Sequence, residues 1–406
     1  MKEIELIQTA LMLAPPWNVV ECQLDINLNH LDIHLHFTRG SRFSCPDCGQ
    51  AECAVHDTVP KSWRHLNFFQ HDTYMHARVP RIKCNNCGVR VVKVPWARND
   101  SGFTLLFEAY IMLLAPSMPV KKIGELVTEH DTRLWRLIQH HVDKAREEAD
   151  YSNVKKVGVD ETSSKRGQNY VSIFVDLEKS KTIFATEGKD STTVERFKAD
   201  LSEHGGDPDA IKNLSCDMSP AFIKGVVENL PNAEITFDKF HILKTLNDAV
   251  DKVRCQEQKG QPELKKTRYI FLKNPKNLTS KQSDRLEDLK LKNLNLKTMR
   301  AYHLRLNFQE LWLQPSDQAE HFLKKWYYWA THSRIEPMKE AAYTIKRHWD
   351  GVLNWFKSGI NNGILEGFNS LVQAAKARAR GYRTNEYLIT MIYLITGKLK
   401  LDLPVY

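Results

Sequence analysis

From residue 154 onward the sequence follows a pattern that restricts the fold more than any other part of the chain. Three strand-like segments come first, in which apolar and polar residues alternate: "VKKVGVDE", "NYVSIFVDL" and "KTIFATEG". Helix-like and strand-like segments then alternate: "TTVERFKADLSEHG", "AIKNLSCD", "PAFIKGVVENL", "AEITFD" and "KFHILKTLNDAVDKV". The order β-β-β-α-β-α-β-α predicts an antiparallel meander whose later strands return, through helices, parallel to the first strand.

Acidic residues stand at the ends of three of these strands. Asp160 ends the first strand, Asp217 the fourth and Asp238 the fifth. The strand order resembles the ribonuclease H-like fold, in which the first strand neighbours the strand after the first helix, so Asp160 and Asp217 would present adjacent carboxylates. Such carboxylates repel each other, and a divalent cation is the usual compensation. Glu161 is expected to point to the other face of its strand, outside the site.

Four of the eight cysteines form two Cys-x-x-Cys-Gly pairs nearer the N-terminus. Cys45 and Cys48 belong to "CPDCG", and Cys84 and Cys87 belong to "CNNCG". Two intervening residues let both thiols of a pair reach one ion, and the glycine relieves the tight turn. Because strand-like "LDIHLHF" and "YMHARVPRIK" lie around the pairs, the pattern predicts a zinc ribbon on β-hairpins with one structural Zn²⁺.

The alternatives at this site are free buried cysteines or a different set of zinc ligands. The 35 residues between the pairs make a longer connection than compact zinc fingers have. Cys53, His56 and His65 lie within it and are possible substitute ligands. The fourth zinc ligand therefore stays open on the sequence alone.

The stretch after "PWARNDSGFT" predicts a small helical DNA-binding element. An apolar helix over about residues 104–115 breaks at "APSMP", and "VKKIGELV" and "TRLWRLIQHHV" follow, separated by "TEHD". Two short amphipathic helices joined by a tight turn are typical of a helix-turn-helix, whose second helix enters the major groove. An ordinary helical hairpin gives the same pattern. The exposed side would present Thr132, Arg133 and Arg136. The buried side would be Leu134, Leu137 and Ile138.

The net charge of +9 is distributed unevenly along the chain. Residues 251–300 hold 14 Lys and Arg against 6 Asp and Glu, whereas residues 151–250 hold 13 against 16. A basic region beside a locally acidic one indicates a polyanionic partner near a cation site, although solvated helix faces give similar totals. We expect Lys165 and Arg166 to contact DNA phosphates.

The composition indicates a folded protein without a membrane partner. The 406 residues suffice for roughly two or three domains, and 42% of them are hydrophobic. The start, "MKEIELIQTALMLAPPWN", is acidic where a secretory signal is basic, and no apolar run reaches the ~18 residues of a membrane span. We therefore expect a cytoplasmic, nucleoid-associated protein whose cysteines do not form a disulfide framework.

Near the C-terminus, "INNGILEGFNSLVQAAKARARGYR" holds one acidic residue, Glu366, followed by a basic run. The turn "NNG" predicts the start of a helix. Its buried stripe would be Leu365, Phe368, Val372 and Ala375. The opposite face would carry Glu366, Asn369, Ser370, Gln373, Lys376 and Arg380. The basic residues expected to contact phosphates are Lys376, Arg378, Arg380 and Arg383.

Taken together, these motifs resemble bacterial insertion-sequence transposases of the DDE type, in the group written IS-L-three. The matching stretches are the two cysteine pairs, "VGVDETSSKRGQNY", "LSCDMSPAF", "FDKFHILK" and "NNGILEGFNS…KARARGYR". The resemblance implies a multidomain α+β protein with a ribonuclease H-like catalytic domain interrupted by a helical insertion. Its expected parts are a zinc ribbon at 1–98, a helix-turn-helix at 99–150, the core at 151–255 and 346–406, and the insertion at 256–345.

The resemblance also implies the catalytic residues and the reaction. Asp160 and Asp217 match the two catalytic aspartates, and Glu366 matches the terminal glutamate. "DKFH" resembles an accessory Asp-x-x-His motif, which places Asp238 and His241 near the site. Two Mg²⁺ (or Mn²⁺) ions would serve phosphodiester hydrolysis and strand transfer on double-stranded DNA, both the element's ends and the target. A homodimer is expected, because two ends are cut and joined together.

Other functions remain open on the sequence alone. A DNA-binding regulator derived from a transposase would keep the fold without catalysis. A ribonuclease H-like nuclease or resolvase would cleave without strand transfer. A zinc-mediated interaction protein would leave the three acids unexplained. The aromatic residues of "KKWYYWATH" fit either base stacking or core packing.

Overall fold

The computed structural model describes residues 3–165, 167, 169–291, 296–360 and 362–404, and Arg166 lies outside them. The chain forms two compact units. The first comprises residues 1–147, 374–395 and 399–406, and the second comprises residues 148–373 and 396–398. One boundary between the units falls between Gln373 and Ala374, whereas the sequence predicted that all of 346–406 belongs to the catalytic domain.

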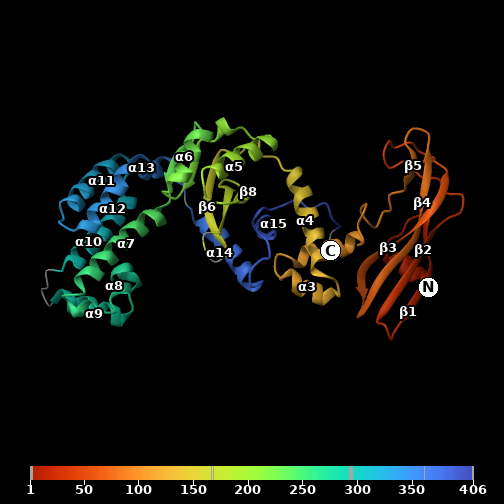
Figure 1. Cartoon of the computed structure of the whole chain (residues 1–406), viewed down its shortest axis with the longest axis horizontal. Coiled ribbons are helices and arrows are strands. Elements are labelled where there is room, and N and C mark those ends of the chain that lie inside the picture. Colours follow the sequence, from red (N-terminus) through yellow and green to blue (C-terminus); the bar gives the residue numbers. More distant parts are fainter. Residues whose placement is uncertain (1–2, 166, 168, 292–295, 361, 405–406) are drawn as a thin grey trace. The chain divides into compact units, whose positions relative to one another are not determined.

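The N-terminal part of the first unit is a five-stranded sheet (Figure 1). The strands run in the order β1-β2-β4-β3, with β5 paired to β4, and only the β2–β4 pair is parallel. Trp17, Trp63 and Trp96 form its buried centre. The elements are α1 (Glu3–Ala10), β1 (Trp17–Asp25), β2 (His30–Phe37), β3 (Val55–Phe68), β4 (His71–Cys84) and β5 (Gly88–Val91).

Three helices follow this sheet: α2 (Leu105–Leu114), α3 (Val120–Val127) and α4 (Asp131–Glu147). The turn between α3 and α4 passes so close to Gly124 that a Cβ atom there would lie 2.5 Å from the Glu129 carbonyl oxygen. Only glycine fits such an approach. The predicted inner side of α4 is confirmed, because Leu134, Leu137 and Ile138 are buried. These helices have the predicted arrangement of a helix-turn-helix.

The second unit contains a five-stranded mixed sheet in the order β10-β9-β6-β7-β8. The first three strands in sequence form the antiparallel meander, and β9 and β10 are parallel to β6, so the predicted strand order is confirmed. The strands are β6 (Lys156–Lys165), β7 (Asn169–Asp176), β8 (Lys181–Glu187), β9 (Asn213–Cys216) and β10 (Glu234–Phe237). The crossover helices are α5 (Thr192–Glu203) and α6 (Pro220–Asn229), and α7 (Lys239–Glu257) follows β10.

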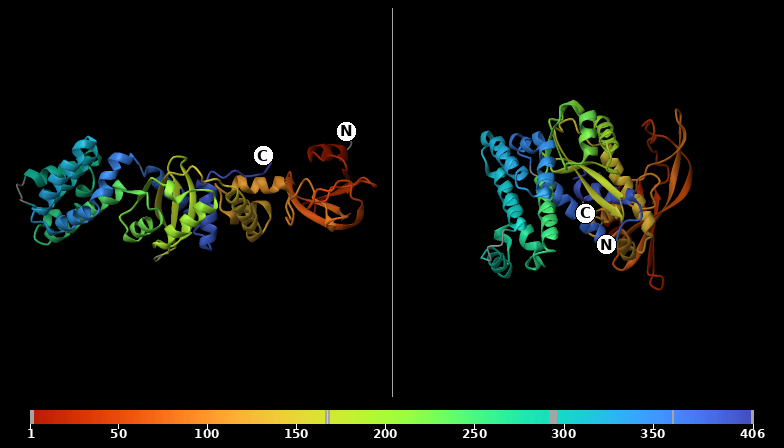
Figure 2. Two further views of the ribbon diagram at one scale, coloured as in Figure 1. Left: turned by 90° about the horizontal axis from the view of Figure 1, so that it is seen from above. Right: turned by 60° about the vertical axis from the view of Figure 1, so that its left-hand side comes forward.

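The insertion after α7 is helical, as predicted (Figure 2). Its helices are α8 (Arg268–Leu272), α9 (Ser280–Leu291), α10 (Lys297–Gln309), α11 (Ser316–Thr331) and α12 (Glu336–Arg347). Three of them, α8, α10 and α12, pack on α7. In "KKWYYWATH", Trp326 is fully buried and donates a hydrogen bond to the Leu304 carbonyl, whereas Tyr328 and Trp329 are exposed. Core packing therefore accounts for Trp326 alone among these three aromatic residues.

Three last helices complete the chain: α13 (Trp349–Ser358), α14 (Gly363–Arg378) and α15 (Asn385–Thr396). Helix α13 packs against β10 so closely that a Cβ atom on Gly351 would lie 2.3 Å from the Phe237 ring. The predicted multidomain α+β fold is confirmed by these sheets and helices together. Among the described helices, none is long and apolar enough to cross a membrane.

Candidate functional site

The strand register of the second unit places three aspartates at one level of the sheet. Gly158 of β6 pairs with Ser215 of β9, and Asp160 and Asp217 each lie two residues beyond that pair. Asp217 and Asp238 directly follow the last paired residues of β9 and β10. Neighbouring strands lie about 4.8 Å apart, so the three aspartates form one row of carboxylates across three adjacent strands. The prediction that Asp160 ends its strand is wrong, because β6 continues to Lys165 by pairing with β7. We call Asp160, Asp217 and Asp238 the aspartate row.

Backbone hydrogen bonds orient each carboxylate of the aspartate row. One oxygen of each side chain accepts a backbone N–H from the residues that follow it. The donors are the N–H groups of Glu161, Ser219 and Phe240, at 2.7, 2.9 and 3.0 Å. The last of these bonds also caps the N-terminus of α7. One oxygen of each carboxylate is thus fixed to the backbone, and the other remains for interactions in the site.

The carboxylates of the aspartate row interact unfavourably with one another. Burial raises the pKa of the Asp160 carboxyl, and the charges of Asp238 and Asp217 raise it further, against the Glu161 N–H bond and the charge of His241. The Asp238 carboxylate accepts a hydrogen bond from the His241 ring, with 3.2 Å between Nδ1 and Oδ2, and this bond raises the pKa of His241 above its usual value. Divalent cations prefer such oxygen ligands and would relieve the repulsion, so the donor set fits Mg²⁺ or Mn²⁺.

Glu161 lies close enough to the aspartate row for the charge of Asp217 to shift its pKa. Burial raises the pKa of Glu161 to about 7, and the neighbouring charge of Asp217 is the next largest cause. The alternation of side chains along a strand had set this residue outside the site. Alternation predicts the face of the sheet on which a side chain lies, but it does not predict which neighbouring charges are close enough to shift its pKa.

Helix α14 packs along β6 and β9 with a matched repeat. Four residues of helix advance about 6 Å, as do two residues of strand, so successive helix turns meet alternate strand residues. Asn369 Nδ2 donates to Asp160 Oδ2 at 2.5 Å. The remaining pairs are Asn362 with Ser215 at 2.7 Å, Leu365 with Gly158, and Gln373 with Thr162 at 2.6 Å. The polar face of α14 therefore lies against the sheet and not only toward solvent.

Glu366 lies on this same polar face of α14, yet its side chain is exposed. It follows Asn362 by four residues and precedes Asn369 by three, so the three share one side of the helix. The Asn369 Oδ1 atom is buried and lacks a hydrogen-bond partner among the described residues. In the described part of the chain, the aspartate row and Glu366 are not gathered closely enough to enclose a metal ion.

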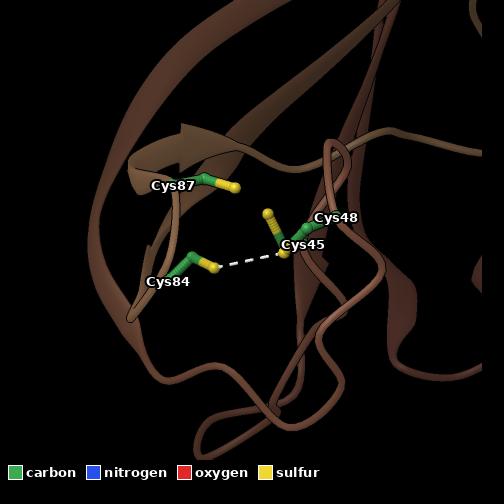
Figure 3. A group of neighbouring side chains, drawn as sticks. All are labelled: Cys45, Cys48, Cys84 and Cys87. Carbon is green, nitrogen blue, oxygen red and sulfur yellow. Dashed lines mark hydrogen bonds between the residues drawn. The ribbon is translucent and has the colours of Figure 1, made fainter.

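The cysteine pairs do form a compact cluster (Figure 3). The sulfurs of Cys45, Cys48, Cys84 and Cys87, the cysteine cluster, all lie within 4.8 Å of one another. A zinc ion with ~2.3 Å bonds to sulfur requires such spacing. The glycine after each pair has a positive φ, 75° at Gly49 and 74° at Gly88, which explains both Cys-x-x-Cys-Gly motifs.

The alternative zinc ligands are occupied or positioned elsewhere. Cys53 is buried and donates to the Gln50 carbonyl at 3.3 Å. His65 Nδ1 lies 2.8 Å from the Thr104 hydroxyl, and burial lowers the pKa of His65 to about 4, with Arg64 adding to the effect. His56 is exposed. The cysteine cluster is therefore complete without these side chains.

The residues predicted to contact DNA differ in their surroundings. Arg133 donates to Glu129 at 2.5 Å and lies over the Phe103 ring, whereas Arg136 is exposed on α4. Arg378 donates to the carbonyl oxygens of Ser117 and Pro116. The other basic residues are Lys165, Arg380 and Arg383, which are exposed, and Lys376, which is half-buried.

Comparisons with known proteins agree with this architecture. The ISL3 transposase family model matches residues 157–392. The helix-turn-helix domain of transposase family ISL3 matches residues 92–142. The zinc-finger of transposases of IS204, IS1001, IS1096 and IS1165 matches residues 41–87.

Two curated relatives are similar along most of the chain. The transposase for insertion sequence element IS1557 of Mycobacterium tuberculosis is 26% identical over 379 residues, covering 85% of this chain and 83% of that protein. The transposase for insertion sequence element IS1001 of Bordetella parapertussis is 28% identical over 366 residues, covering 86% of this chain and 87% of that protein.

Proposed function

Because the chain belongs to the ISL3 family of DDE transposases, we propose that its DNA cleavage and strand transfer occur at the aspartate row. It is a DNA transposase with a helix-turn-helix for DNA binding and a zinc ribbon for structural Zn²⁺. The observation that carries the proposal is the common level of Asp160, Asp217 and Asp238 on three adjacent strands of the sheet.

Asp160, Asp217 and Glu366 would hold two Mg²⁺ or Mn²⁺ ions. Bound there, the ions would activate water or a DNA 3′-hydroxyl and stabilise the leaving oxygen. The shared face of Asn362, Glu366 and Asn369 supports this assignment, because two of these residues contact β9 and β6 beside the row. The exposed Glu366 side chain would complete the ligand set from α14.

Asp238 and His241 would act beside the ligands. Asp238 accepts the Phe240 N–H with one oxygen and holds the His241 ring with the other. The raised pKa of His241 favours its protonated form, and a protonated ring donates hydrogen bonds to anions. His241 would thus donate to a phosphate oxygen or hold a proton during the reaction.

The partners would be the terminal repeats of the insertion sequence and a target DNA. The second helix of the helix-turn-helix, α4, would enter the major groove of each repeat. Arg136 and Lys165 are exposed and would contact the DNA. Cutting and joining two ends in one reaction favours a homodimer.

The test is a paired-end assay with Asp160→Asn, Asp217→Asn and Glu366→Gln. Each variant is expected to lose Mg²⁺-dependent cleavage and joining while it still binds the terminal repeat. Asp209→Asn is the matched control, because Asp209 is an exposed acid of the same unit. Cleavage retained by one variant would remove that residue from the ligand set. Cleavage without joining by the wild-type protein would indicate a nuclease, and binding without cleavage a regulator.

A further inference from the structure

The last part of the chain belongs to the DNA-binding unit. Residues 374–395, the C-terminal segment, form one compact unit with the helix-turn-helix. The Arg378 guanidinium donates to the Ser117 carbonyl at 2.7 Å and to the Pro116 carbonyl at 3.4 Å, just before α3 begins. Arg378 therefore attaches the segment to the helix-turn-helix, and its donors serve that contact.

Aromatic stacking attaches the C-terminal segment to α4 itself. The buried Trp135 ring stacks on Tyr387 at 4.1 Å with an interplanar angle of 3°. Tyr382 also contacts Trp135 edge-on, with 6.0 Å between the ring centroids. Stacked and edge-on aromatic pairs stabilise a contact beyond the area that they bury. Gln139 Nε2 also donates to Glu386 at 2.8 Å. The segment thus covers one side of α4 along more than one turn.

The side of α4 that faces away from its buried residues stays accessible. Its exposed positions include Arg133, Arg136, His140 and Asp143. The spacing of three or four residues makes these positions one stripe of the helix. The C-terminal segment therefore packs on α4 without covering the side that a helix-turn-helix presents to bases.

A hollow of about 160 Å³ lies where the segment meets the start of α4. On one side it is lined by Lys121 of α3 and by Asp131 and Thr132 of α4, and on the other by Gly381 and Arg383. Lys121, Arg380 and Arg383 are exposed. Asp131 adds a negative charge to the lining, which disfavours an anion inside the hollow. An anion would therefore be bound by the exposed basic side chains around it.

We propose that the basic turn, residues 379–383, contacts the DNA backbone beside the base pairs read by α4. The DNA-end-binding surface is then assembled from two parts of the chain that lie far apart in sequence. Its partner is the phosphate backbone of duplex DNA, which the positive charges of Arg380 and Arg383 complement. The surface is continuous with the helix-turn-helix. The proposal rests on the proposed function only in taking the terminal repeat as the bound duplex.

Backbone contacts have a recognisable signature in binding experiments. They add affinity for any sequence, and each phosphate contact contributes about 0.9 to the slope of log affinity against log salt. They do not discriminate between base pairs. The combined Arg380→Ala and Arg383→Ala variant is therefore expected to bind about tenfold more weakly, with a salt slope lower by about 2. Its preference for the terminal repeat over a scrambled duplex should not change.

The assay uses the full chain, loaded with zinc, and a duplex with the terminal repeat of its own insertion sequence. The matched control is Lys155→Ala with Lys212→Ala, two exposed lysines that precede β6 and β9. They lie at the end of the sheet opposite the aspartate row. The control is expected to bind like the wild-type protein. Equal affinity and equal salt slope in the arginine variant would overturn the proposal, and a wild-type protein that does not bind the repeat would overturn the proposed function itself.

A second variant tests the attachment of the segment. Tyr387→Ala removes the ring that stacks on Trp135, and Tyr387→Phe keeps it. We expect Tyr387→Ala to lose phosphate protection at the backbone positions that the double arginine variant also loses, while Tyr387→Phe retains it. Hydroxyl-radical footprinting on the terminal-repeat duplex reads these positions. Full protection with Tyr387→Ala would overturn the part of the proposal in which the stack on Trp135 positions the basic turn on the DNA.

Discussion

The zinc site and the aspartate row are built in different ways. The cysteine cluster is compact, with all four sulfurs within 4.8 Å, and each of its two turns ends in a glycine with positive φ. The aspartate row shares one level of the sheet, while Glu366 is exposed on α14. Structural zinc sites are closed by protein ligands, whereas catalytic metals keep positions open for substrate. We infer that the first site supports folding and that the second is left open for DNA.

Removing a zinc ligand should have the largest effect. Cys84→Ser is expected to lower bound zinc from one equivalent to none and to unfold the ribbon locally, because zinc binding contributes on the order of 10 kcal/mol in small zinc domains. Zinc content and hydrogen exchange of residues 43–53 and 84–88 measure this. Cys22→Ser, a cysteine of β1 outside the cluster, is the control. Full zinc content in Cys84→Ser would exclude Cys84 as a ligand.

Neutralising one carboxylate of the aspartate row should lower activity without lowering stability. Asp217→Asn is expected to lower the cleavage rate by at least about 10²-fold. Without Mg²⁺ or Mn²⁺, the zinc-loaded variant should be as stable as the wild type or more stable, because the charge of Asp217 raises the pKa values of Asp160 and Glu161. Thermal unfolding of the zinc-loaded proteins in buffer without added Mg²⁺ or Mn²⁺ measures the stability. A destabilised Asp217→Asn protein would make this aspartate a structural residue.

The two units each contain a histidine with a shifted pKa, and the two shifts have opposite directions. His65, half-buried beside Thr104, has its pKa lowered to about 4, whereas the pKa of His241 is raised. Below about pH 6.5 the unfolded chain binds a proton that the folded His65 resists, so the free energy of unfolding falls as the pH decreases toward 4. The loss would reach about 3 kcal/mol.

Urea unfolding at pH 7 and pH 4.5 measures this loss for the first unit. His65→Gln should remove most of the difference between the two pH values. His56→Gln, at an exposed position of the same connection, should retain it. An unchanged pH dependence in His65→Gln would mean that another group carries the acid sensitivity.

The smallest effect is expected where α14 meets the aspartate row. Asn369→Ala removes the donor to Asp160 Oδ2 and should lower the cleavage rate by about tenfold, because a hydrogen bond to a charged group contributes about 1.5 kcal/mol or more. It should also raise the Mn²⁺ concentration for half-maximal rate. Gln373→Ala, which removes the next contact of α14 with β6, is the control and should leave that concentration unchanged. Equal shifts in both variants would mean that only helix packing is affected.

Local patterns in the sequence predicted most of this organisation. Alternation and turn residues predicted the strand order of the second unit, and its resemblance to the ribonuclease H-like fold placed Asp160 beside Asp217. The cysteine spacing predicted the cysteine cluster, because two residues and a glycine determine the turn. Such features depend on neighbours a few residues away or on a known order of strands.

Features that depend on packing between distant segments were not predictable. The bond from Asn369 to Asp160 requires the register of α14 on β6, and the two residues lie 209 positions apart. The carbonyl partners of Arg378 lie 261 and 262 positions away from it. The sequence predicted Glu366 and the basic residues after it on one helix, with the basic residues on phosphates, and it gave no sign that the compact units divide α14 after Gln373.

The most direct test of the central claim is anomalous diffraction at the manganese edge, from crystals of the zinc-loaded protein with terminal-repeat DNA and Mn²⁺. The account predicts manganese peaks bound by Asp160, Asp217 and Glu366, separate from one zinc at the cysteine cluster. Manganese away from the aspartate row, or the same peaks in the Asp160→Asn protein, would contradict it.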